Sequence, residues 1–166
     1  MSVVTVVGNP RAGSRTLAAA VAATEALGLP GQKDLIDLSA LAPVLLDPGA
    51  HPGLEVAIEL VTSASVVVLA SPTYKATYTG LLKAFLDRLP SGALAGKTAL
   101  PILVMGHPRH ALAVEVHFRP LLVELGAFVP TPGLALLESD LPGDEVLAAW
   151  AELVSPQITL REGALR

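Results

Sequence analysis

The sequence predicts an α/β fold, a three-layer sandwich in which helices cover both faces of a five-stranded parallel sheet with strand order 2-1-3-4-5. Three observations support this. Strand-like and helix-like segments alternate along the chain. Turn signals rich in Pro and Gly separate many of them. Ala, Val and Leu dominate a composition that is 52% hydrophobic but only 4% aromatic, as expected where strands are buried on both faces.

The elements follow in order from local pattern. Short apolar runs bounded by turn residues predict strands, and longer runs between them predict helices. The predicted strands are Val3–Val7, Asp34–Leu38, Ser65–Ala70, Thr98–Met105 and Leu134–Leu137. The predicted helices are Ser14–Leu27, Leu54–Ser63, Thr79–Leu89, Ala111–Leu125 and Asp144–Leu153. Residues 41–52 are predicted to form an irregular loop that contains several prolines. The tail after Pro156 is expected to be loose or to dock on a neighbour.

Composition limits the classes of function. The chain has 166 residues, which fits one domain spanning 1–166. A net charge of −4 argues against a nucleic-acid partner and a polybasic membrane anchor. The absence of cysteine excludes disulfides, thiolate metal sites and iron–sulfur clusters. Apolar runs are too short for a membrane helix, which needs roughly 20 residues, so we expect a cytoplasmic protein. The charged fraction of 16% indicates self-association.

The loop between the first predicted strand and helix is the strongest functional signal. At this place an α/β domain binds phosphate, because the helix start offers unpaired backbone N–H groups and a partial positive charge. The alternative is that the stretch binds no ligand and is only a turn between strand and helix whose serine caps the helix. The loop also carries polar and cationic side chains suited to a phosphate monoester or diphosphate: Asn9, Arg11, Ser14, Arg15 and Thr16.

Two familiar nucleotide motifs do not match this loop. Gly8 and Gly13 have the spacing of the glycines in a triphosphate P-loop, but Ser14 and Arg15 stand where Lys and then Ser or Thr are required. The Gly-x-Gly-x-x-Gly spacing of a dinucleotide fingerprint is also absent. The loop therefore belongs to neither class.

A second loop, residues 71–80, follows the third predicted strand. In the predicted topology it should meet residues 8–16 and 106–110 at the carboxyl edge of the sheet. Pro72 fixes one backbone dihedral and lacks an N–H, and the backbone of Thr73–Thr77 can pair with a planar heterocycle. Tyr74 and Tyr78, the two tyrosines of the chain, either lie in this site or fill a subunit interface.

These loops resemble motifs of one family. Positions 8–16 read Gly-Asn-Pro-Arg-Ala-Gly-Ser-Arg-Thr, which resembles the Gly-Ser-x-Arg-x-x-Ser phosphate loop of the NAD(P)H-dependent FMN reductases. Positions 71–83 read Ser-Pro-Thr-Tyr-Lys-Ala-Thr-Tyr-Thr-Gly-Leu-Leu-Lys, which resembles the flavin-ring loop of that family. The Tyr-Lys-Ala version, followed by Leu-Asp-Arg-Leu-Pro at 86–90, is closest to the reductase components of two-component alkanesulfonate monooxygenases. The similarity extends from about residue 3 to residue 127.

The resemblance implies a flavodoxin-like homodimer or homotetramer that reduces FMN with NADPH or NADH. The nicotinamide would pass hydride to the flavin with no catalytic acid, base or nucleophile, and a flavin-dependent monooxygenase would be a partner. No metal site is expected, because the four histidines have no zinc-ligand spacing. By position, the FMN phosphate would be held by Asn9, Arg11, Ser14, Arg15 and Thr16. The flavin ring would be lined by Pro72, Thr73, Tyr74, Lys75 and Thr77, with Gly106 and its neighbours on the third side.

The chain departs from the family pattern at three places. Asn9 replaces the usual Ser, and the third loop has Gly106 and His107 where a Gly-Gly pair is common. Val116 stands where the alkanesulfonate reductases carry an aromatic residue that is linked to a helix bulge.

The third loop also suggests how the nucleotide is chosen. His107, Arg109 and His110 lie at the expected crevice mouth. One hypothesis is that they and Arg15 favour the additional 2′-phosphate of NADPH. The alternative is a merely solvated loop.

Three other functions remain open from the sequence. A quinone or azo-dye reductase that keeps its FMN bound would use the same pocket. A flavodoxin-type electron carrier would need a Thr/Ser-rich first loop and stronger acidity, whereas this loop has two arginines. A phospho-receiver domain would need paired acids after the first strand, where Gly8 and Asn9 stand.

Overall fold

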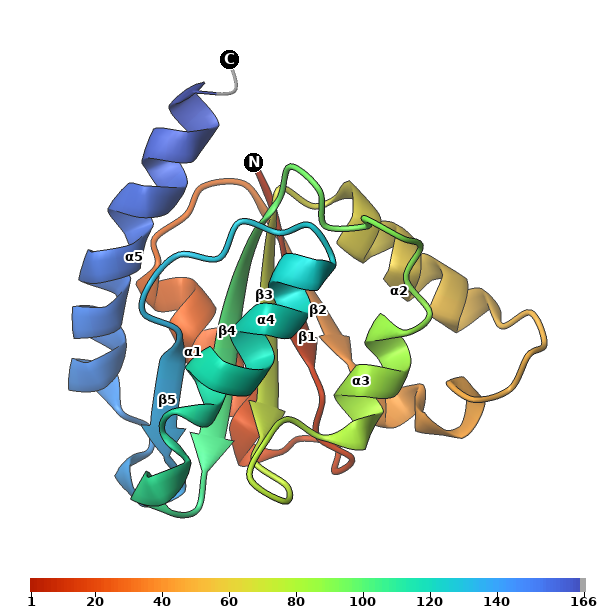
Figure 1. Ribbon diagram of the computed structural model, residues 1–166, viewed down its shortest axis with the longest axis horizontal. Coiled ribbons are helices and arrows are strands. Elements are labelled where there is room, and N and C mark those ends of the chain that lie inside the picture. The colour runs from red at the N-terminus through yellow and green to blue at the C-terminus, as the bar shows by residue number, and fades with distance from the viewer. Residues whose placement is uncertain (165–166) are drawn as a thin grey trace.

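The computed structural model, which describes residues 1–164, contains one parallel sheet with the strand order β2-β1-β3-β4-β5 (Figure 1). The predicted fold class and strand order are confirmed. The strands are β1 (Ser2–Val7), β2 (Gln32–Asp37), β3 (Val66–Pro72), β4 (Thr98–Met105) and β5 (Leu134–Leu137).

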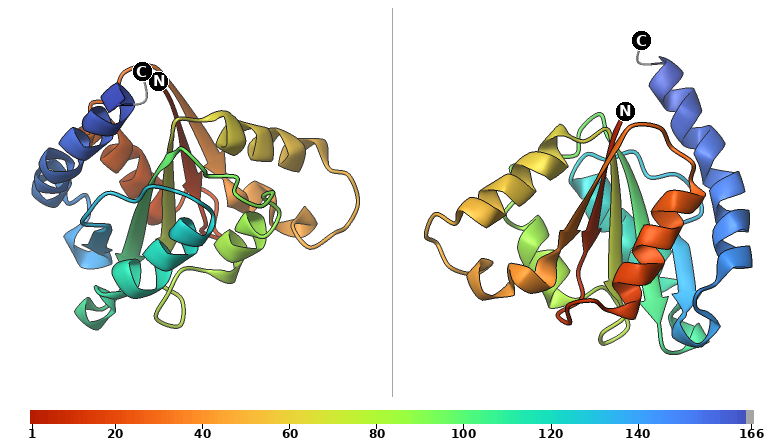
Figure 2. Two further views of the ribbon diagram at one scale, coloured as in Figure 1. Left: turned by 45° about the horizontal axis from the view of Figure 1, so that its top comes forward. Right: turned by 180° about the vertical axis from the view of Figure 1, so that it is seen from behind.

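Helices cover both faces of the sheet (Figure 2). One layer consists of α1 (Arg15–Ala26) and α5 (Asp144–Ala164). The other consists of α2 (Pro52–Ser63), α3 (Gly80–Leu86) and α4 (Arg119–Glu124). Each layer closes a separate cluster of buried hydrophobic side chains against the sheet. The β3 and β4 strands are buried along their whole length, as expected for central parallel strands.

Strand register brings the predicted loops together. Val7 of β1 pairs with Ala70 of β3, and Pro72 of β3 pairs with Val104 of β4. The three strands therefore end at nearly the same level, and the loops that follow them lie at the lower edge of the molecule in Figure 1. The predicted convergence of residues 8–16, 71–80 and 106–110 is confirmed.

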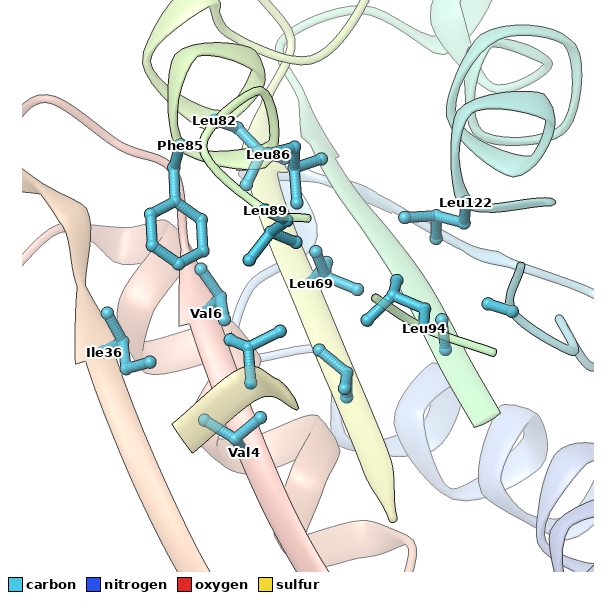
Figure 3. Packing of buried hydrophobic residues seen from close by; sticks show 14 of the residues in the cluster. Val4, Val6, Ile36, Leu69, Leu82, Phe85, Leu86, Leu89, Leu94 and Leu122 are labelled. Carbon is cyan, nitrogen blue, oxygen red and sulfur yellow. The ribbon is translucent and has the colours of Figure 1, made fainter. Parts of the chain in front are cut away.

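The core beneath α3 fixes the position of the second loop. Leu82 and Phe85 of α3 pack with Val6 and Leu69 of the central strands, and all four side chains are fully buried (Figure 3). Complete burial of such a side chain contributes about 1.5–3 kcal/mol. Because α3 begins directly after residues 71–79, this packing also holds the end of the loop.

The fourth predicted helix is not a continuous α-helix, and this prediction was wrong in part. A π-helix, Val114–Phe118, precedes α4, and the Arg119 N–H bonds to the Val114 carbonyl five residues back. Pro120 has no N–H for the carbonyl of Val116, so a regular α-helical ladder is broken here. The bulge spans Val116 even though this residue is not aromatic.

The last helix is longer than predicted. It extends to Ala164 and passes through Pro156, although a proline in a helix removes one ladder hydrogen bond. The helix continues because Trp150, Val154 and Ile158, spaced one helical turn apart, are all buried in the cluster beneath α1 and α5. The described part of the tail after Pro156 is therefore helical.

Other elements differ from expectation only at their ends. Leu38, predicted as the end of a strand, begins a 3₁₀-helix (Leu38–Ala40). The irregular loop that follows contains one further 3₁₀ turn (Ala42–Val44). Arg88 anchors this loop by donating to the carbonyls of Leu45 (3.1 Å) and Asp47 (2.8 Å). None of the described helices combines the length and apolarity that crossing a membrane requires.

Candidate functional site

The first loop is held in shape by a buried asparagine. The Asn9 amide nitrogen donates to Thr16 Oγ1 at 3.0 Å, and its oxygen accepts from the Arg11 N–H at 3.0 Å. Asn9 and Thr16 are both buried. Satisfied buried polar groups of this kind rigidify their surroundings. The pair therefore supports the loop from beneath and leaves the Arg11 side chain exposed.

The start of α1 has the properties of an anion site. Ser14 is the N-cap, and its Oγ accepts from the Leu17 N–H at 3.2 Å. The Ala18 N–H donates to the Ser14 carbonyl at 3.2 Å, so the N–H groups of Arg15 and Thr16 precede the helical ladder. The first turn contains no acidic residue. Its partial positive charge is therefore not neutralised from within the helix.

Buried hydroxyl groups connect the first loop to the second. Thr79 Oγ1 donates to the Gly8 carbonyl at 2.6 Å and accepts from the Leu82 N–H at 3.1 Å. The Thr79 N–H donates to Ser71 Oγ at 2.9 Å, and Ser71 Oγ donates to the Pro72 carbonyl at 2.9 Å. Sequence reasoning missed Ser71 and Thr79. The available signal was a threonine directly before a helical run, which is an N-cap pattern.

The glycine at this junction is required by close packing. A Cβ atom on Gly8 would lie 2.6 Å from Leu82 Cβ, which is far inside van der Waals contact. The first loop can therefore approach α3 this closely only with glycine at position 8.

The second loop ends in a tight turn with an unusual backbone. Tyr74 and Thr77 exchange two backbone hydrogen bonds, at 2.9 and 3.4 Å. The two residues between them are in the left-handed region, with φ of 53° at Lys75 and 71° at Ala76. This is a type I′ turn, which normally places Gly, Asn or Asp at its centre. Backbone strain of this kind clusters at ligand sites.

A cavity of about 530 Å³ opens where the loops meet, a size typical of small-molecule sites. All of the predicted phosphate residues contribute to its wall, as do three of the predicted ring residues and Gly106. The lining residues are Asn9, Arg11, Ala12, Gly13, Ser14, Arg15, Thr16, Pro72, Thr73, Tyr74, Val104, Gly106 and Glu138. Thr73 is tied to the floor of the cavity, since its N–H and Oγ1 both donate to the Val104 carbonyl, at 2.9 and 3.1 Å.

Some predicted site residues lie beside the cavity rather than in its wall. Lys75 is exposed at the tip of the turn. Arg109 lies in a short 3₁₀-helix (Pro108–His110), and His107 caps the start of this helix. His107 Nδ1 accepts from the Arg109 N–H at 3.2 Å, and Arg109 Nε donates to His110 Nε2 at 3.4 Å.

The two tyrosines have different environments. Tyr74 lines the cavity and is 46% exposed. Tyr78 packs against the core, where its ring lies 5.4 Å from that of Phe118 in the π-helix. Thr77, between them, has a buried Oγ1 with no hydrogen-bond partner among the described residues.

Glu138 is a cavity residue that sequence reasoning missed. It directly follows β5, and its Oε1 lies 2.7 Å from Nη2 of Arg15. The prediction considered the loops after the first, third and fourth strands alone. Because β5 is parallel to β4 and adjacent to it, its carboxyl end reaches the same edge, and this was the available signal.

Comparison with known proteins relates the chain to flavin reductases. Residues 1–141 match a family model described as NADPH-dependent FMN reductase. A protein of Escherichia coli, FMN reductase (NADPH), is 38% identical over 130 residues, which cover 76% of this chain and 68% of that protein. The apo structure of an NADH:FMN oxidoreductase (EmoB) superposes with a TM-score of 0.86 at 33% identity, covering 96% of this chain and 88% of that one. An archaeal flavodoxin, 16% identical with a TM-score of 0.67 over 96% of this chain and 99% of that one, shares the fold.

Proposed function

The chain belongs to the NADPH-dependent FMN reductase family, and we propose that the cavity beside β1, β3 and β4 is where it reduces FMN with NADPH or NADH. One observation carries this proposal. The cationic start of α1 matches the phosphate motif of the family, and Pro72, Thr73 and Tyr74 belong to its ring motif. Both groups of residues line one cavity.

The phosphate end of the cavity fits a flavin phosphate. Arg11 and Arg15 both line it, and guanidinium groups bind phosphate through charge-assisted hydrogen bonds. The free N–H groups at the start of α1 add donors of the kind that anions use at helix N-termini. Asn9 and Thr16 hold the loop in the conformation that presents these groups.

The other end of the cavity fits a planar ring. Pro72, Thr73 and Tyr74 form one side. A Cβ added to Gly106 would meet no atom within 4 Å, so the third loop leaves space there. Thr77 does not line the cavity, and its buried hydroxyl has no hydrogen-bond partner among the described residues.

The chain contributes positioning and electrostatics to the reaction. When bound, FMN supplies the chemistry, because its ring accepts the hydride that the nicotinamide donates. The left-handed turn at Lys75 and Ala76 orients backbone polar groups beside the ring, and the phosphate loop fixes the distance of the ring from α1. Orientation of this kind lowers the entropic part of the barrier. No side chain is assigned as an acid, base or nucleophile.

We further propose that the cations beside the cavity bind the nicotinamide nucleotide. Lys75 and Arg109 are exposed, and His107 lies next to Arg109. These groups are placed to favour the 2′-phosphate of NADPH, together with Arg15. The ratio of NADPH to NADH activity in Arg109→Ala measures this role, and an unchanged ratio would contradict it.

The assembly and the downstream partner are also proposals. Leu112, Val116 and Val123, in or beside the π-helix and α4, are 71%, 56% and 55% exposed. We propose that they are covered in a homodimer or homotetramer. We also propose that reduced FMN is passed to a flavin-dependent monooxygenase.

The phosphate assignment is tested with Arg11→Ala. The substitution removes one charge-assisted hydrogen bond and should weaken FMN binding by about 1–3 kcal/mol, with riboflavin binding unchanged. Flavin fluorescence titration measures both affinities. Lys33→Ala, which removes a cation in β2 outside the cavity, is the matched control. Unchanged FMN affinity in Arg11→Ala would show that the phosphate binds elsewhere.

A further inference from the structure

Glu138 places a negative charge in a cavity proposed to bind an anion. Among the described residues that line the cavity, Glu138 alone carries a carboxylate. It lies against the phosphate end, where its partner Arg15 is the first residue of α1. A carboxylate at this position opposes the binding of a phosphate, so its presence calls for a functional explanation.

The ion pair contributes little to stability. The side chains of Arg15 and Glu138 are 71% and 43% exposed, and exposed pairs of this kind contribute very little. The carboxylate is nevertheless well placed. Leu137 of β5 pairs with Met105 of β4, which brings Glu138 level with Gly106 at the rim of the cavity. The backbone position of Glu138 is therefore set by the pairing of β5 with β4.

The two arginines of the loop are in different electrostatic situations. Arg15 is paired with Glu138 at 2.7 Å. Arg11 forms no ion pair with any described residue. An anion that enters the loop therefore meets one guanidinium with no carboxylate partner among the described residues and one that a carboxylate already contacts.

We propose that Glu138 weakens the binding of the flavin phosphate through Arg15, so that FMN remains an exchangeable substrate and is not retained as a tightly bound cofactor. This inference rests on the proposed function, because it requires the phosphate to bind at residues 9–16. It makes Glu138 a determinant of affinity that acts through another residue.

The test measures FMN and riboflavin affinities in Glu138→Gln, which keeps the shape of the side chain and removes its charge. FMN should bind roughly three- to tenfold more tightly, as expected for one charge removed near a phosphate in a solvent-exposed site. FMN release, followed by stopped-flow displacement, should slow accordingly. Riboflavin affinity should not change, and the gain for FMN should shrink at high salt. Glu145→Gln, at the exposed start of α5 and outside the cavity, should change none of these values.

A second background shows whether the effect passes through Arg15. In Arg15→Gln, the additional change Glu138→Gln should raise FMN affinity by a clearly smaller factor, because only the direct repulsion between carboxylate and phosphate is then removed. A gain of the same size in both backgrounds would overturn the proposal that Glu138 acts through Arg15. So would unchanged or weaker FMN binding in Glu138→Gln alone, or an equal gain for riboflavin.

Wild-type affinities separate this inference from the function on which it rests. If the wild-type protein binds FMN no more tightly than riboflavin, the phosphate assignment itself fails, and the role of Glu138 fails with it. If the wild-type protein prefers FMN and Glu138→Gln does not change that preference, the role of Glu138 alone is overturned.

Discussion

At Ala76 the chain adopts a left-handed backbone without the residue that best tolerates it. Both Lys75 and Ala76 have positive φ, and this conformation costs roughly 1–2 kcal/mol for a residue with a Cβ. The cost falls on the turn proposed to face the flavin ring. Strain that persists at a ligand site is commonly part of how the site is pre-organised.

Ala76→Gly should therefore stabilise the protein. Glycine removes the left-handed penalty but loses more backbone entropy on folding, so the expected net gain in the free energy of unfolding is about 0.5–1 kcal/mol. Urea denaturation followed by circular dichroism measures it. Ala84→Gly, the same change inside α3, should instead destabilise by about 1 kcal/mol. A loss of stability in Ala76→Gly would show that the turn is not strained.

Single residues of the site were predictable where one loop holds them. The predicted phosphate residues of the first loop, together with Pro72, Thr73 and Tyr74 of the second, line one cavity, whereas their roles toward FMN stay predictions. Glu138 was not found, because its contact with Arg15 links positions far apart in the chain. Ser71 and Thr79 were missed because their hydroxyls act inside the protein and not toward a ligand.

The π-helix is anchored by the ion pair between Glu115 and Arg119, which also forms hydrogen bonds with the backbone before β5. Glu115 Oε1 accepts from Nη2 of Arg119 at 3.1 Å and from the Gly133 N–H at 2.6 Å. Arg119 also donates to the carbonyl of Pro130 at 3.0 Å. A Cβ on Gly133 would lie 2.7 Å from Cγ2 of Val114, so the segment before β5 can approach the π-helix this closely only with glycine there.

This network should make stability depend on pH. The hydrogen bond from Arg119 lowers the pKa of Glu115 below its ordinary value of 4.5. A carboxyl whose pKa is lower in the folded protein contributes stability above its ordinary pKa, and that contribution is lost as pH falls through the lowered value. The destabilisation caused by Glu115→Gln should therefore be largest near neutral pH and shrink below pH 4.5.

At neutral pH, Glu115→Gln should lower the free energy of unfolding by about 1–2 kcal/mol. Urea denaturation at several pH values measures both the size and the trend. Glu124→Gln, at an exposed position of α4, should have little effect at any pH. A constant difference between wild type and Glu115→Gln across the acid range would contradict the assignment.

Elements with a clear hydrophobic period were predictable, and those shaped by distant contacts were not. The strands and the first three helices were predicted to within a few residues at their ends. The break in the fourth helix had a local signal in Pro120, which the prediction did not use. The contact of Glu115 with Gly133 that holds the broken segment is not visible in the local pattern. The last helix was ended too early because proline is a local helix-breaking signal, whereas burial of Val154 and Ile158 outweighs it.

For the whole molecule, the low fraction of charge and the exposed apolar side chains lead to a prediction about mass. Light scattering should give two or four times the 17.0 kDa of one chain. Leu112→Glu would place a charge on the surface proposed to be covered, and it should shift the protein toward smaller species. A wild-type protein that remains at 17.0 kDa at high concentration would contradict self-association.

The overall architecture was the most predictable level. Alternating strands and helices with right-handed crossovers leave few arrangements for five strands, and the observed order β2-β1-β3-β4-β5 is the expected one. Pairing with another copy has no comparable sequence period, so the oligomeric state stays a prediction. The same holds for the cytoplasmic location and for the extent of the domain over residues 1–166.

The hydroxyl bridge from Thr79 to Gly8 has a consequence for selectivity. It joins the first loop, proposed to bind the flavin phosphate, to the end of the second loop, proposed to face the flavin ring, through a 2.6 Å hydrogen bond. The distance between the two loops is therefore fixed. A flavin whose linker is shorter or longer than ribityl could contact one loop but not both, so the length of the ligand as well as its charge would decide which flavins the protein binds.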